Sequence, residues 1–222
     1  MNTTCQLYLI SPLDVSGDFP ERLARALDAG KGIVTAFQFR VKGIDDQHEA
    51  ARLAEPLQAI CADRDVGFIV NDDIALAKRL GADGVHLGQS DGEVKEARQQ
   101  LGRDAQIGVT CHDSRHFAMQ AGEDGADYVA FGAFFPSTTK ETEHRAGLDL
   151  LDWWYRVFEL PSVAIGGITP ENCAPLVTAG ADFLAVSGSV WNGDEVKAVR
   201  AFAEAIAAAP VPDAEGLPDS DS

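Results

Sequence analysis

The sequence predicts a single α/β domain folded as a (β/α)8 or TIM barrel, and three observations support this prediction. A Gly-Ala-Asp triplet followed by an apolar run occurs at residues 81–86, 125–130 and 180–185, which is typical of a helix that ends at a glycine and turns into a buried strand. Eight strand-like segments occur along the chain, each followed by a helix or by a loop and a helix, as in a barrel of this class. The 222 residues, 45% of them hydrophobic, suffice for one sizeable core.

An open, doubly wound sheet is the alternative arrangement of alternating strands and helices. Such a sheet commonly carries a GxGxxG turn after its first strand. The first strand-like run here, residues 6–10, ends instead in Ser11-Pro12. The closed barrel is therefore preferred.

The elements of the first half follow from apolar patterning and from the residues that end each run. In chain order they are a strand at 6–10, a helix at 19–29, a strand at 36–42, a helix that Asp45 caps and that runs to about Asp63, a strand at 67–70, and a helix at 74–80 that Gly81 closes. The strand at 36–42 alternates, so that Phe37, Phe39 and Val41 share one face and Gln38, Arg40 and Lys42 share the other. The alternation leaves open which face points into the barrel.

The second half continues the same alternation. Its expected elements are a strand near Val85, a strand at 106–110, a helix at 114–123, a strand near Val129, a strand at 162–165, a helix at 172–179, a strand near Leu184 and a helix at 194–208. Residues 1–209 thus form the barrel. Residues 210–222 are rich in Pro, Asp and Ala, and we expect them to be a disordered acidic tail.

Composition narrows the classes of function. A formal net charge of −17 disfavours binding to nucleic acid or to an anionic membrane, and a phosphate site would need a local group of basic residues. No apolar run is long enough to span a membrane, and the N-terminus lacks the charged and apolar regions of a secretory signal. The cysteines, at positions 5, 61, 111 and 173, are widely spaced, which favours free thiols over a disulfide or metal site. We expect a cytoplasmic protein, and a homo-oligomer is compatible with the sequence.

Two neighbouring strands end in carboxylates. Residues 67–70 run into Asn71-Asp72-Asp73, and the next strand ends in Gln89-Ser90-Asp91. The carboxyl ends of barrel strands meet at one face, so Asp72 and Asp91 are expected to lie together there. Because like charges repel, the pair needs a shared proton, a basic partner or a divalent cation. Asp73 is interpreted as the cap of the following helix.

Other strand ends contribute cations, hydroxyls and glycines. In strand order these are Gln38, Arg40 and Lys42; Thr110; Ser137, Thr138, Thr139 and Lys140; Gly166-Gly167; and Ser187-Gly188-Ser189. Glycines and helix starts bring backbone N–H groups close to anions, and the loops after strands seven and eight are the usual phosphate site of this fold. A simple tight turn is the alternative explanation for Gly166 and Gly167.

Together, these strand ends indicate one highly charged anion, a metal ion and a second phosphate. Arg40, Lys42 and Lys140 suit a diphosphate, and Mg²⁺ accepts one or two carboxylates while substrate phosphates complete its shell. No activated nucleophile is evident in the sequence. The pattern predicts departure of diphosphate with a second phosphorylated molecule as acceptor.

These residues, in this order, resemble the thiamine phosphate synthase family. The motifs are QFRVK at 38–42, VNDD at 70–73, GVHLGQSD at 84–91, GVTCH at 108–112, FPSTTK at 135–140 and AIGGI at 164–168. The resemblance covers about residues 7–202. It implies a TIM-barrel transferase of thiamine biosynthesis that joins 4-amino-5-hydroxymethyl-2-methylpyrimidine diphosphate to the ring nitrogen of hydroxyethylthiazole phosphate and releases diphosphate.

The resemblance also implies roles for individual residues. Asp72 and Asp91 would hold Mg²⁺. The departing diphosphate would be met by Arg40, Lys42, Thr110 and Lys140, and the substrates would be bound by Gln38, Asn71, Ser137, Thr139, Gly167, Ser187 and Gly188. Thr110 stands where the family usually has serine and Ser137 where it usually has threonine, so the reach of each hydroxyl differs from the usual family member.

Two other functions remain to be weighed. Thiazole tautomerases share this barrel and use a histidine near the end of strand five, where His112 stands here. In such an enzyme Asp72, Asp91, Lys42 and Lys140 would have no use, so the synthase is favoured. A non-catalytic sensor of phosphate ligands would be expected to have lost a carboxylate or a lysine, and none is lost.

Overall fold

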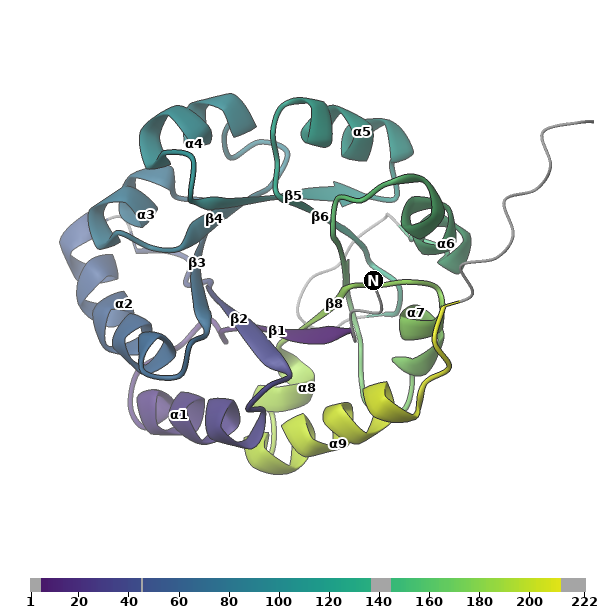
Figure 1. Ribbon diagram of the computed structural model, residues 1–222. Helices are drawn as coiled ribbons and strands as arrows, with labels where there is room; N and C mark the ends of the chain where they lie inside the picture. Colours follow the sequence, from purple (N-terminus) through teal and green to yellow (C-terminus); the bar gives the residue numbers. More distant parts are fainter. Residues whose placement is uncertain (1–4, 45, 137–144, 213–222) are drawn as a thin grey trace, which may run out of the picture.

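The computed structural model describes residues 5–44, 46–136 and 145–212, and it confirms the predicted fold class. Parallel strands β1 to β8 close into a barrel in sequence order, and the helices form a ring around it (Figure 1). The strands are β1 (Gln6–Ile10), β2 (Val34–Phe39), β3 (Gly67–Asn71), β4 (Gly84–Leu87), β5 (Gln106–His112), β6 (Tyr128–Gly132), β7 (Ser162–Ile165) and β8 (Phe183–Val186). The helices are α1 (Phe19–Ala29), α2 (Gln47–Ala62), α3 (Ile74–Leu80), α4 (Val94–Leu101), α5 (Arg115–Glu123), α6 (Leu148–Val157), α7 (Ala174–Thr178), α8 (Gly188–Trp191) and α9 (Glu195–Ala208).

The core has an outer and an inner layer. The outer layer joins alternate strand residues to the apolar faces of the helices and holds large side chains such as Phe37, Phe68 and Trp154. The inner buried cluster contains strand residues alone: Tyr8, Ile10, Ile69, Tyr128, Ala130, Val163 and Ala185. Side chains alternate between the two faces of a strand, so this second group fills the inside of the barrel.

Strand β2 shows which of its faces points inward. The Phe37 ring lies 6.3 Å from the ring of Phe19 on α1, so the aromatic face packs against the helices. Gln38 is 3% exposed and its Nε2 donates a hydrogen bond of 3.0 Å to the Tyr8 hydroxyl inside the barrel. The polar face is therefore the inner one. The strand ends at Phe39, earlier than the predicted Lys42, and residues 40–42 leave the sheet at the mouth of the barrel.

The aspartates of the Gly-Ala-Asp triplets join pairs of strands at their amino ends. The Asp83 carboxylate accepts the Phe68 N–H at 2.7 Å, and the Asp127 carboxylate accepts the Ile107 N–H at 2.7 Å. Asp182 does the same for Ser162 at 2.8 Å. Each aspartate precedes one strand and binds the start of the preceding strand, which explains why the triplet recurs before β4, β6 and β8.

Several other predictions can be compared directly with the structure. Asp73 caps α3 by accepting the Leu76 N–H at 2.8 Å, as predicted, and Gly81 closes this helix in the left-handed conformation with φ of 58°. Helix α2 is capped by Asp46, whose side chain accepts the His48 N–H, one residue later than expected. The short helix α8 was not predicted.

All four cysteines are buried, and none of them pairs in a disulfide. Within the described residues no helix is long and apolar enough to cross a membrane. The acidic tail stays a prediction, since residues 213–222 lie outside the described part of the chain.

Candidate active site

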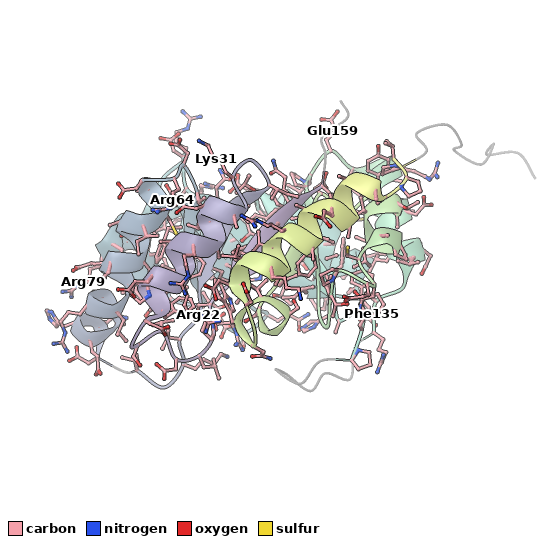
Figure 2. The ribbon with its side chains drawn as sticks, turned by 90° about the horizontal axis from the view of Figure 1, so that it is seen from below. Arg22, Lys31, Arg64, Arg79, Phe135 and Glu159 are labelled. Carbon is pink, nitrogen blue, oxygen red and sulfur yellow. The ribbon has the colours of Figure 1, made fainter. Side chains whose placement is uncertain are left out.

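A cavity of about 690 Å³ lies at the carboxyl ends of the strands. Figure 2 shows the barrel from the side, with Phe135, which follows β6, towards one edge and Lys31 and Glu159, which precede β2 and β7, at the opposite edge. The predicted site residues that line the cavity are Gln38, Arg40, Lys42, Asn71, Asp72, Asp91, Thr110, Gly167, Ser187 and Gly188. Ser137, Thr139 and Lys140 lie outside the described residues. The fold thus brings together every predicted site residue that it describes.

The two carboxylates predicted to pair lie side by side at the ends of β3 and β4. Asp72 has a φ of 66°, a left-handed conformation that is costly for a residue with a side chain and that is often found at functional sites. A side chain at Gly88 would collide with the Asp91 carboxylate and would lie 3.9 Å from Asp72 Oδ1. Gly88 therefore leaves the space into which both carboxylates point.

The electrostatics of this pair favour a cation. Burial and the charge of Asp91 raise the pKa of Asp72, while Lys42 opposes this shift. The Lys42 Nζ lies 4.0 Å from Asp72 Oδ2, but its side chain is 56% exposed, so it offsets only part of the repulsion. Among the described residues no three His, Cys, Asp or Glu side chains form a metal-binding group. The pair fits an ion such as Mg²⁺, which takes one or two carboxylates and fills its shell with substrate oxygens.

The glycine-rich ends of β7 and β8 lie on the same cavity. Gly166 and Gly167 have φ values of 105° and 62°, and a side chain on either would collide with the loop that follows β6. The turn is held by Asn172, which donates to the Gly167 carbonyl at 3.0 Å and accepts the Thr169 N–H at 2.8 Å. The turn and its packing against this loop therefore account for both glycines, and their role in binding a phosphate stays a prediction.

Helix α8 begins at Gly188 on the cavity and is anchored on its far side. The Trp191 Nε1 donates to the Ile10 carbonyl at 2.6 Å. Arg22 donates to the Trp191 and Gly193 carbonyls, and its guanidinium pairs with the buried Glu195 at 3.0 Å. These contacts fix the direction in which the first N–H groups of α8 point, and such groups have no partner within the helix.

A chain of buried polar side chains crosses the floor of the cavity. Beyond the contact between Gln38 and Tyr8, the Tyr8 and Tyr128 hydroxyls lie 2.9 Å apart, and Tyr128 contacts His86 Nδ1 at 3.1 Å. His86 Nε2 then lies 2.9 Å from Thr110 Oγ1. Burial lowers the pKa of His86 to about 4 and raises the pKa of Tyr8 to about 12, so both are neutral at neutral pH.

Sequence reasoning missed three members of this floor: Tyr8, His86 and Tyr128. A signal for them was available. Each occupies an inward position of its strand, where barrels mostly carry branched aliphatic side chains. A buried tyrosine or histidine needs hydrogen-bond partners, so several at inward positions indicate a connected polar group.

Comparison with known proteins identifies the family of this chain. Residues 7–190 match the family model described as thiamine monophosphate synthase. The chain belongs to this family. The thiamine-phosphate synthase of Erythrobacter litoralis is 76% identical over 206 residues, covering 92% of this chain and 96% of that protein. That of Rhodospirillum centenum is 54% identical over 191 residues, covering 86% and 91%.

Structural comparison agrees with membership of the thiamine monophosphate synthase family. The solved structure of a thiamine phosphate pyrophosphorylase from Pyrococcus furiosus superposes with a TM-score of 0.80 at 28% identity, covering 93% of this chain and 97% of that one. The resemblance stated from the six motifs is confirmed. The relatives from Erythrobacter litoralis and Rhodospirillum centenum are named as synthases, so neither the tautomerase nor the sensor is favoured.

Proposed function

We propose that this chain is a thiamine-phosphate synthase, a transferase that couples 4-amino-5-hydroxymethyl-2-methylpyrimidine diphosphate to hydroxyethylthiazole phosphate and releases diphosphate. The observation that carries the proposal is that one cavity joins the carboxylate pair of Asp72 and Asp91 to the glycine-rich ends of β7 and β8. The first region suits a metal-bound diphosphate, and the second suits the phosphate of the acceptor. The volume of about 690 Å³ is in the range of small-molecule sites.

Asp72 and Asp91 would hold Mg²⁺ in this enzyme. When bound, the ion supplies positive charge to the phosphate oxygens of the substrate. The relief of repulsion between two adjacent carboxylates supports this assignment.

The reaction needs charge stabilisation more than a protein nucleophile. The bond between the pyrimidine methylene carbon and the diphosphate oxygen breaks, and its electron pair leaves with the diphosphate. The amino-pyrimidine ring shares the positive charge left on the methylene carbon, and the lone pair of the thiazole nitrogen forms the new C–N bond. Arg40 and Lys42 stabilise the charge that develops on the leaving group, and the Thr110 hydroxyl donates a hydrogen bond to it.

The remaining predicted residues bind and orient the two substrates. Gln38 and Asn71 contact the pyrimidine diphosphate from β2 and β3. Gly167, Ser187 and Gly188 offer N–H groups to the thiazole phosphate. By family resemblance Ser137, Thr139 and Lys140 complete the diphosphate site.

We also infer the setting in which this enzyme works. Free buried thiols and the charge of −17 support a cytoplasmic protein that binds neither nucleic acid nor membrane. Its partners are then phosphorylated small molecules, and a homo-oligomer is compatible with the fold.

A coupling assay with both phosphorylated heterocycles, with and without Mg²⁺, tests the proposed function. We expect thiamine phosphate and diphosphate in equal amounts, only when Mg²⁺ is present. Conversion of one thiazole tautomer to another without coupling would establish the tautomerase instead. Ligand binding without turnover would establish the sensor.

A further inference from the structure

The polar chain on the cavity floor connects two residues with different proposed tasks. It runs from Gln38 on β2 through Tyr8, Tyr128 and His86 to Thr110 on β5. Gln38, His86 and Thr110 line the cavity, whereas the two tyrosines lie in the inner core beneath it. Each link is 2.9 to 3.1 Å long, within ordinary hydrogen-bond distance.

The direction of each hydrogen bond follows from the first one. The Gln38 Nε2 can only donate, so the Tyr8 oxygen accepts from it. The Tyr8 O–H then goes to its other contact in the described chain, the Tyr128 oxygen, because leaving a buried donor unpaired is costly. The Tyr128 O–H in turn goes to His86 Nδ1.

The second half of the chain follows in the same way. A ring nitrogen that accepts a hydrogen bond carries no proton, so the imidazole proton must be on the other nitrogen. Because Nδ1 accepts from Tyr128, the proton of His86 sits on Nε2 and is donated to Thr110 Oγ1. Thr110 Oγ1 accepts this bond, which leaves its O–H available to an acceptor in the cavity that Thr110 lines.

We propose that Tyr8, Tyr128 and His86 are positioning residues that impose one proton order across the active-site floor, with Gln38 offering its carbonyl oxygen and Thr110 offering its O–H to the substrates. The inference rests on the proposed function for the identity of those substrates. The Gln38 oxygen then accepts from the exocyclic amino group of the pyrimidine. The Thr110 O–H donates to the departing diphosphate oxygen.

With the opposite proton order, Gln38 would no longer offer its carbonyl oxygen to the pyrimidine and Thr110 would no longer offer its O–H to the diphosphate. If the Gln38 amide were turned over, every bond in the chain would reverse, and His86 would carry its proton on Nδ1. Thr110 would then donate to His86 and present only lone pairs to an anionic leaving group. The two orders therefore differ in chemistry and in one measurable property, the tautomer of His86.

Nitrogen-15 NMR of the ligand-free wild-type protein tests the proton order directly. The imidazole signals of His86 are assigned by their loss in His86→Asn. We expect a protonated Nε2 and an unprotonated Nδ1 at neutral pH. A proton on Nδ1, or on both nitrogens, would overturn the proposal. This measurement needs no turnover, so its failure is distinct from failure of the proposed function.

Kinetics test whether the order matters for catalysis. Tyr128→Phe removes the hydroxyl that links Tyr8 to His86, and we expect kcat to fall about tenfold with both KM values nearly unchanged, because the loss is confined to the transition state. Thr110→Val is expected to lower kcat about 100-fold, as loss of a donor to developing charge does. Tyr155→Phe makes the same change as Tyr128→Phe outside the barrel, on α6, and should leave kcat unaltered.

The double variant decides between positioning and a merely structural role. If Tyr128 acts through Thr110, then adding Tyr128→Phe to Thr110→Val causes no further loss of kcat. If the two losses multiply, Tyr128 does not act through Thr110, and the proposed link from the tyrosines through His86 to the Thr110 hydroxyl is wrong.

Discussion

Replacing Asp91 by asparagine should make the metal-free protein more stable and the enzyme inactive. In the folded protein, burial and the charge of Asp91 hold the pKa of Asp72 above its usual range. A carboxyl group with a raised pKa stabilises the fold at pH values below its unfolded pKa, and this contribution is lost as the pH rises through the folded pKa. Above the folded pKa of Asp72 the repulsion between the two carboxylates is therefore fully present, and Asp91→Asn removes it.

The size of the effect follows from distance and exposure. Two unit charges 4 Å apart interact by about 1 kcal/mol in bulk water and about 4 kcal/mol at an effective dielectric constant of about 20. The Asp72 side chain is 33% exposed and Lys42 lies 4.0 Å away, so solvent and the lysine reduce the upper figure. We expect the free energy of unfolding of metal-free Asp91→Asn to exceed that of the wild type by about 1 kcal/mol. The difference should shrink as the pH falls through the folded pKa of Asp72.

Urea denaturation in the presence of a chelator measures the difference in unfolding free energy between the wild type and Asp91→Asn. A second series of denaturation measurements contains Mg²⁺ with inorganic diphosphate as the ligand. Ligand at about 100 times its dissociation constant stabilises the folded state by about 2.7 kcal/mol. We expect this gain in the wild type and its absence in Asp91→Asn. Asp73→Asn is the matched control, because it removes one charge beside Asp72 yet keeps a side chain that can cap α3. A less stable metal-free Asp91→Asn, or one that keeps the gain, would refute the metal assignment.

Three further variants test other parts of the structure. Asp127→Ala should lower the free energy of unfolding by about 1–3 kcal/mol, because the Ile107 N–H loses its acceptor at 2.7 Å; urea denaturation measures this, and an unchanged stability would show that water replaces the carboxylate. Gly167→Ala should cost at least about 1–2 kcal/mol from its φ of 62° and raise KM for the thiazole phosphate; a normal KM would exclude Gly167 from that subsite. Lys42→Ala should lower kcat by about 100-fold and the unfolding free energy by less than about 1 kcal/mol, since its side chain is 56% exposed; unaltered steady-state kinetics would remove it from the diphosphate site.

Much of the barrel could be predicted because its signals are local. The Gly-Ala-Asp triplets, the cap at Asp73 and the apolar runs all act within a few residues of one another. The errors also have local causes. Strand β2 was extended to Lys42 because alternation continues beyond the last residue that pairs with a neighbouring strand. The cap of α2 was placed at Asp45 because two adjacent aspartates look alike in sequence, and Asp46 makes the capping bond.

The residues of the candidate site fall into two groups: those that could be predicted from the sequence and those whose contacts depend on the folded barrel. Residue type and strand-end position were enough to predict that Arg40, Lys42, Asp72 and Asp91 lie together, because a barrel delivers all strand ends to one face. Position in sequence carries no information about which side chains touch across the barrel. Contacts such as Tyr8 with Tyr128 depend on the register and tilt of all the strands together.

The fold class, the family and the end of the barrel at which the candidate site lies could all be predicted from the amino-acid sequence. Tertiary structure alone decided that the polar face of β2 points inward, that Gly88 opens the space for two carboxylates, and that a hydrogen-bonded floor joins Gln38 to Thr110. The physical reason is that helix ends and apolar periodicity are set by near neighbours in the chain. The pairing of buried polar groups is set only when the barrel closes and each donor must find its acceptor.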